Sequence, residues 1–158
     1  MLKYVNHDIV FQEFPDEVTL AVNLSGCPYR CPGCHSAWLQ TDAGEELTEE
    51  RLLALADGYR GEVTCVALMG GDADPIAVAR LLAAVKRYCG PLRTGWYSGR
   101  EHLPDGFPAA AFDYVKLGPY RADRGPLRSP ATNQRLYRVA PDGTLSDITA
   151  RLQRPAAG

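Results

Sequence analysis

Long apolar runs and blocks of like charge are both missing from this sequence of 158 residues. No stretch approaches the roughly 20 apolar residues that a membrane-spanning helix needs, and 17 basic against 19 acidic residues leave a formal net charge of -2. Membranes and nucleic acids are therefore not expected partners. The first residues also lack the basic start and apolar run of a signal peptide, because they include His7, Asp8, Gln12 and Glu13. We expect a cytoplasmic protein.

Cysteine is scarce and odd in number, with five residues in the chain. A disulfide framework uses an even number, and cytosolic thiols stay reduced, so clustered cysteines there are more often catalytic or metal-binding. The chain has no internal repeat and no low-complexity tract, and 46% of its residues are hydrophobic. This length and composition predict one globular domain over residues 1–158, large enough to fold without disulfides.

The first third of the chain predicts two strands and a helix. Alternating apolar residues indicate two short strands between residues 9 and 24. Thr48 is expected to cap a helix with acidic residues in its first turn, where the helix dipole favours anions. That helix is expected to end near Gly58 or Gly61.

A buried strand and a second helix are expected next. Residues 63–69 are apolar except for Thr64, which is typical of a strand covered on both faces in a parallel sheet. Asp74 and Pro75 provide the N-cap and the first position of a helix. A Gly-Pro pair at residues 90–91 ends it.

The rest of the chain predicts two more parallel strands and a hairpin. Strands are expected over residues 92–97 and 112–117, and residues 135–140 and 145–149 flank a Pro-Asp-Gly turn typical of a β-hairpin. Strands that alternate with helices imply a parallel sheet with right-handed crossovers. Four such strands are too few to close a barrel, which typically needs about 250 residues. We expect an α/β fold, an open partial (β/α) barrel with a mostly parallel sheet and β-hairpins added at both termini.

Three of the five cysteines carry the clearest chemical signal. Cys27, Cys31 and Cys34 form a C-x3-C-x2-C pattern whose intervals fit neither helix nor strand, so a tight loop is expected. This loop follows the second predicted strand, at the end where α/β folds place their ligands. Three thiolates are a soft ligand set that selects iron-sulfur clusters, zinc or copper. Bound to a cluster of four irons, they leave one iron open to a ligand that is not protein.

Other metal and redox sites fit parts of the same pattern. A structural zinc site normally has four protein ligands, so Cys65 or Cys89 would have to supply the fourth. Residues 31–35 match the C-x-x-C-H motif of c-type haem attachment, and C-x-x-C alone is typical of a redox dithiol. Both of these alternatives leave Cys27 without a role.

A second group of candidate residues follows the cysteines. Gly70, Gly71 and Asp72 come directly after the buried strand, and two glycines there permit unusual dihedrals and let a ligand approach the backbone. By itself this triplet is also an ordinary strand-to-helix turn. Ser98 stands at the end of the next predicted strand. Lys116 lies within an apolar strand, where a charged side chain needs a partner, a cavity or a route to water.

The cysteine pattern and the Gly-Gly-Asp triplet together resemble the radical S-adenosylmethionine enzymes. Residues 31–39, 113–120 and 132–137 narrow the resemblance, because they look like the activating proteins of anaerobic ribonucleoside-triphosphate reductase, which are also small. An aromatic residue usually precedes the third cysteine in the superfamily, whereas Gly33 stands there in this chain, as small residues also do in the reductase activases. The resemblance implies the open barrel of radical S-adenosylmethionine enzymes and a glycyl-radical activase.

Cofactors and partners are implied by the same resemblance. Cys27, Cys31 and Cys34 would hold a 4Fe-4S cluster that binds S-adenosyl-L-methionine, with Gly33 and His35 at the adenosine by their position beside the last ligand. The cleaved cofactor yields a 5'-deoxyadenosyl radical, which takes a hydrogen atom from a backbone glycine of the anaerobic ribonucleotide reductase. The electron would come from a low-potential donor such as flavodoxin or ferredoxin.

The second group of residues is expected to bind the remaining parts of S-adenosylmethionine. The resemblance assigns Gly70, Gly71 and Asp72 to its methionine end, with the amino group bound there. Ser98 is expected to bond the ribose or the carboxylate, and a plain Ser-Gly turn is the alternative. We expect Lys116 to bind the carboxylate, and the alternative is an ammonium group that reaches water.

Two other functions stay open at this point. One is radical S-adenosylmethionine chemistry on a different substrate. The other is a non-enzymatic module that binds a metal or carries electrons. A cluster that cleaves S-adenosylmethionine would separate the enzymes from the module.

Overall fold

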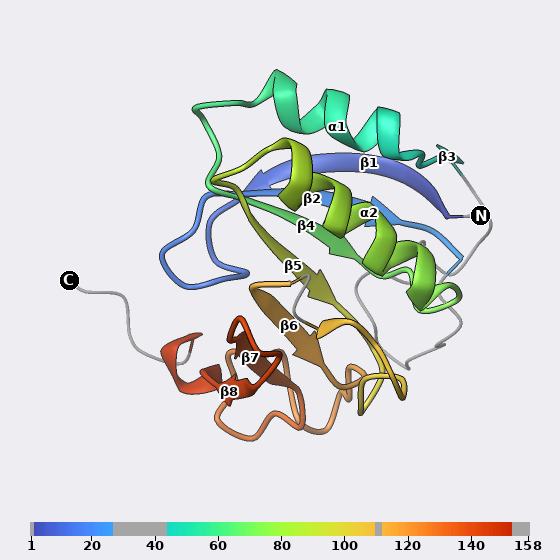
Figure 1. Ribbon diagram of the computed structural model, residues 1–158. Helices are drawn as coiled ribbons and strands as arrows, with labels where there is room; N and C mark the ends of the chain where they lie inside the picture. Colours follow the sequence, from blue (N-terminus) through green and yellow to red (C-terminus); the bar gives the residue numbers. More distant parts are fainter. Residues whose placement is uncertain (1, 27–43, 110–111, 153–158) are drawn as a thin grey trace.

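The computed structural model describes residues 2–26, 44–109 and 112–152, which form an open, mixed eight-stranded sheet with two α-helices (Figure 1). The strands are β1 (Lys3–Val10), β2 (Thr19–Leu24), β3 (Glu45–Glu46), β4 (Cys65–Met69), β5 (Arg93–Tyr97), β6 (Tyr114–Leu117), β7 (Arg135–Val139) and β8 (Leu145–Asp147). The helices are α1 (Glu49–Gly58), α2 (Pro75–Tyr88) and the short 3-10 helix η3 (Thr149–Leu152). The strand order across the sheet is β3-β1-β2-β4-β5-β6-β7-β8.

The four central strands β2, β4, β5 and β6 are parallel, and antiparallel strands extend the sheet on both sides. β1 pairs with β2 and β3, and β7 pairs with β6 and β8. The predicted α/β class and the strand pairs added at both ends are confirmed. The expectation of a mostly parallel sheet is right for the central strands only, because each end of the chain adds antiparallel strands and makes the whole sheet mixed.

Both predicted α-helices are present, with the expected residues at their starts. Thr48 Oγ1 accepts a hydrogen bond from Arg51 N at 3.1 Å, and Asp74 Oδ1 accepts one from Ala77 N at 3.2 Å. Each bond satisfies one of the amides that the first helical turn leaves without a partner. Pro75 occupies the first position of α2, where no backbone donor is needed.

The two faces of the sheet are covered differently (Figure 1). α1 and α2 pack on one face, and alternate strand residues such as Leu68 and Trp96 contribute to the main core there. On the other face a smaller cluster forms around Phe14, from the β1–β2 connection, and Leu136. Phe14 lies so close to Gly95 that a Cβ atom at residue 95 would be 2.4 Å from its ring. Glycine at this position therefore lets the connection cover that face.

Candidate functional site

The carboxyl ends of the four parallel strands lie along one edge of the sheet, here named the carboxyl edge. Gly70 follows β4, Ser98 follows β5, and Lys116 lies near the end of β6. Backbone hydrogen bonds connect these strand ends, since Gly70 N donates to Tyr97 O and Ser98 N donates to Lys116 O, both at 2.9 Å. Folds with parallel sheets bind their ligands at this edge. The sheet therefore places three of the predicted site segments side by side.

Gly70 and Gly71 adopt backbone conformations that favour glycine, with φ angles of 100° and 90°. A Cβ atom on Gly71 would lie 2.6 Å from Val78 Cγ2 and 2.8 Å from Leu24 Cδ1. The carbonyl of Gly70 accepts a hydrogen bond from the buried indole Nε1 of Trp96 at 2.6 Å. The turn after β4 is thus fixed by its own backbone and by a side chain from the neighbouring strand.

The carboxylate of Asp72 is buried directly beside this turn. Ser98 Oγ donates a hydrogen bond to its Oδ1 at 2.5 Å, and Gly99 N donates one to its Oδ2 at 2.9 Å. Among the residues that the structure describes, no lysine or arginine forms an ion pair with Asp72. A buried carboxylate is stable when it is paired or coordinates a cation. The arrangement therefore suits a ligand that brings its own positive charge.

The ammonium group of Lys116 is also buried. It donates hydrogen bonds to Gly118 O and Gln134 Oε1, both at 3.0 Å, and lies 5.4 Å from the ring centre of Tyr97. Tyr97 packs with the smaller core cluster on one face of the sheet, whereas Trp96, the preceding residue, belongs to the main core on the other face. The side chain does not reach out to solvent, and its predicted contact with a cofactor carboxylate stays a prediction.

Several contributors to this edge were not expected from the sequence. Trp96 donates a hydrogen bond to Gly70, and Gly99 donates one to Asp72. Gln134 accepts one from Lys116. The alternation of side chains along a strand would place residues 96 and 98 on one face. Gln134 belongs to the segment 132–137 that carried the resemblance, but nothing in the sequence assigned it a partner.

The predicted cysteine ligands lie outside the described residues, as do Gly33 and His35. The described chain stops at Gly26, two residues after β2, and resumes at Gly44. A Cβ atom on Gly44 would lie 2.1 Å from Tyr4 O, and Tyr4 pairs with Leu24, the last residue of β2. Both ends of the cysteine segment are thus attached at the carboxyl edge. Among the described residues, no group of three histidine, cysteine or acidic side chains is arranged to bind a metal.

Neither Cys65 nor Cys89 lies at the carboxyl edge. Cys65 is the first residue of β4, and Cys89 caps the end of α2, which runs back from the carboxyl edge. Both thiols are free and buried, and burial raises the pKa of each. Since the thiolate is the metal ligand, neither position favours the fourth ligand of a zinc site.

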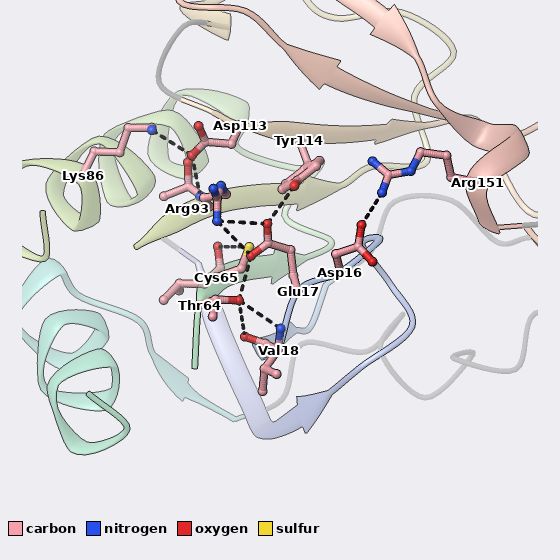
Figure 2. Close-up of polar contacts among 12 residues, drawn as sticks. Asp16, Glu17, Val18, Thr64, Cys65, Lys86, Arg93, Asp113, Tyr114 and Arg151 are labelled. Carbon is pink, nitrogen blue, oxygen red and sulfur yellow. Dashed lines mark hydrogen bonds and ion pairs between the residues drawn. The ribbon is translucent and has the colours of Figure 1, made fainter. Parts of the chain in front are cut away.

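A second buried carboxylate, Glu17, lies at the opposite edge of the sheet, where the parallel strands begin (Figure 2). We name this the amino edge. Its carboxylate accepts hydrogen bonds from the hydroxyls of Thr64 and Tyr114, both at 2.7 Å, and Arg93 Nη1 lies 3.4 Å away. Burial and the bond to Glu17 raise the pKa of Tyr114. Glu17 is therefore satisfied and charge-balanced by the protein itself.

No protein-family model, curated protein or solved structure matches this chain. In the part of the chain that the structure describes, no helix combines the length and the apolar character needed to cross a membrane.

Proposed function

We propose that the chain is a radical S-adenosylmethionine activase of anaerobic ribonucleotide reductase, with a 4Fe-4S cluster held by Cys27, Cys31 and Cys34. Its open sheet would be the partial barrel of that enzyme class, and it would act in the cytoplasm with flavodoxin or ferredoxin as electron donor. With S-adenosylmethionine bound, the cluster would supply a 5'-deoxyadenosyl radical that takes a hydrogen atom from a glycine of the reductase.

This proposal rests on the surroundings of the Asp72 carboxylate. It is a buried carboxylate that receives hydrogen bonds from neutral groups only, and no described lysine or arginine balances its charge. A carboxylate has about four lone-pair positions, and two hydrogen bonds leave room for another donor. The amino group of S-adenosylmethionine carries such N–H donors, and the ligand as a whole brings the positive charge of its sulfonium. The half-buried Gly70 and the buried Gly71 shape the turn beside Asp72, which would meet the methionine end of the same ligand.

The path of the chain supports a cluster beside Asp72, and the available ligands support the choice of metal. The cysteine segment leaves from Gly26 and returns at Gly44, and both residues lie at the carboxyl edge that carries Asp72. Three thiolates without a fourth protein ligand suit a cluster with one open iron better than a structural zinc ion. The buried positions of Cys65 and Cys89 agree, because neither thiol ionises readily.

The chain offers three more residues for the cofactor. Gly33 and His35, beside the third cysteine, would contact the adenosine. Lys116 would contact the carboxylate, and its present bonds to Gly118 and Gln134 already hold the ammonium in place. A radical must be kept from water, so a protein substrate that closes an open site is physically reasonable.

Anaerobic reconstitution with iron and sulfide tests cluster and cofactor together. The protein should gain a visible absorbance that bleaches with dithionite, and should cleave S-adenosylmethionine to 5'-deoxyadenosine. Cys31→Ala should abolish both, whereas Cys89→Ala, which removes a thiol at the end of α2, should retain both. A protein that binds zinc instead and yields no 5'-deoxyadenosine would refute the proposal in favour of a non-enzymatic metal module.

The substrate is tested with the reductase itself. Mixing the reduced protein, S-adenosylmethionine and an anaerobic ribonucleotide reductase should produce the doublet of a glycyl radical in electron paramagnetic resonance. Cleavage of S-adenosylmethionine without that doublet would support the cofactors but point to a different substrate.

A further inference from the structure

The hydroxyl of Ser98 is already committed to protein groups. Its oxygen donates to Asp72 Oδ1 at 2.5 Å and accepts from Arg100 N at 3.0 Å, and the residue is only 1% exposed. A serine hydroxyl has one proton to donate. Ser98 therefore has no proton left for a ribose or a carboxylate of a ligand unless it gives up Asp72.

The end of β5 holds the Gly-Gly-Asp turn at three points. Trp96 Nε1 donates to Gly70 O at 2.6 Å, Ser98 Oγ donates to one carboxylate oxygen of Asp72, and Gly99 N donates to the other. All three donors come from one strand end that is itself paired with β4 and β6. A carboxylate held at both oxygens by a rigid strand has a fixed orientation before a ligand arrives.

We propose that Ser98 is a positioning residue that acts on S-adenosylmethionine through Asp72, and does not itself contact the ligand. This inference rests on the proposed function. Its physical basis is preorganisation: the bonds from Ser98 and Gly99 orient the carboxylate, so that its remaining lone pairs face the amino group without a loss of side-chain freedom on binding. The ligand would then be selected for an N–H donor at that point.

A double-mutant cycle in S-adenosylmethionine binding tests the inference. Ser98→Ala should weaken binding to the reconstituted protein by about tenfold, the effect of one hydrogen bond to a charged group. In the Asp72→Ala background the same substitution should change affinity by less than about twofold, because interacting residues are non-additive. Ser98→Thr, which keeps the hydroxyl, should restore most of the affinity. Ser146→Ala changes an exposed serine in β8 and is the control, which should leave the affinity unchanged.

A ligand without the amino group gives an independent measure. An analogue of S-adenosylmethionine that lacks this group should bind wild type and Ser98→Ala equally, because Asp72 then has no N–H donor to receive. Should Ser98→Ala fail to fold, Ser98→Cys replaces the hydroxyl by a weak donor of similar shape and enters the same cycle.

The outcomes separate this inference from the proposed function. Additive losses from the Ser98 and Asp72 substitutions, or weaker binding of the analogue by Ser98→Ala, would show direct contact with the ligand and overturn the inference alone. A wild-type protein that carries no cluster and binds no S-adenosylmethionine would overturn the proposed function and the inference with it. Iron content that stays constant across the variants excludes loss of the cluster as the cause of weaker binding.

Discussion

Two buried carboxylates at opposite edges of one sheet are held in different ways. At the amino edge, Glu17 receives two hydroxyl hydrogen bonds and lies 3.4 Å from the guanidinium of Arg93 (Figure 2). At the carboxyl edge, Asp72 receives one hydroxyl and one amide hydrogen bond, and no described residue supplies a positive charge. The first site is balanced by the protein and the second is not.

Under the proposed function, this difference separates a carboxylate that stabilises the fold, Glu17, from one that would bind the ligand, Asp72. Removing one partner of a balanced buried network leaves other groups unsatisfied and lowers stability. An unbalanced carboxylate costs free energy in the empty protein, which a cationic ligand can recover. The comparison predicts that removing the carboxylate at the amino edge mainly lowers stability, and that removing the carboxylate at the carboxyl edge mainly weakens binding.

Glu17→Ala should have the largest effect on stability. It leaves the hydroxyl of Tyr114 without its acceptor and leaves Thr64 only the longer bond to Val18 O at 3.3 Å. The free energy of unfolding should therefore fall by about 3 kcal/mol in urea denaturation. Asp16→Asn is the matched control, because it removes only the surface ion pair with Arg151 and keeps a residue type that tolerates its positive φ of 64°. That control should lose less than about 1 kcal/mol. Equal losses in both variants would mean that the Glu17 network adds nothing.

Asp72→Ala should give the opposite pattern. Its affinity for S-adenosylmethionine should fall about 100-fold, as expected when one partner of a buried charge pair is removed, while iron content stays unchanged. Its stability should fall less than that of Glu17→Ala. Calorimetric titration of the reconstituted proteins checks both points. Loss of the cluster in Asp72→Ala, or similarly weakened binding in Glu17→Ala, would remove the distinction between the two edges.

Gly71→Ala tests how tightly the turn beside Asp72 is packed. A Cβ atom there would overlap Val78 and Leu24 in a backbone with φ of 90°, so the free energy of unfolding should fall by about 2 kcal/mol. Gly143→Ala is the control for backbone strain alone, since its φ is 88° but nothing lies within 4 Å of the added atom. Thermal unfolding should show a clearly smaller loss there. Equal losses would indicate strain without crowding at residue 71.

The helices and the placement of the site were predictable because their signals are local. Thr48 and Asp74 cap the two α-helices as the sequence indicated. The order of strands and helices also placed Gly70 and Ser98 at one edge. The two-residue strand β3 was not predictable, because Glu45 and Glu46 have no strand pattern and pair with β1 only through the tertiary fold.

The partners within each site were beyond the reach of the sequence. The bond from Ser98 to Asp72 depends on the register of β4 against β5, which sets Met69 opposite Tyr97. Glu17 lies between the two strands predicted over residues 9–24, directly after a Pro-Asp pair typical of a turn, yet it is buried against residues far along the chain. Local patterns give the strand ends, whereas register and packing decide which side chains meet there.

Tyr114→Phe tests one hydrogen bond of the balanced network at the amino edge, and its expected effect is small. Burial and Glu17 raise its pKa, so the stability from its protonated form is complete below about pH 10, the usual pKa of tyrosine, and is lost as pH rises further. Tyr114→Phe should cost about 1 kcal/mol at neutral pH. Above about pH 10 the wild type should then lose stability faster than the variant, and the two curves should converge. Guanidinium unfolding of both proteins across this range checks the prediction, because parallel pH dependences would mean that the phenol titrates alike in the folded and unfolded states.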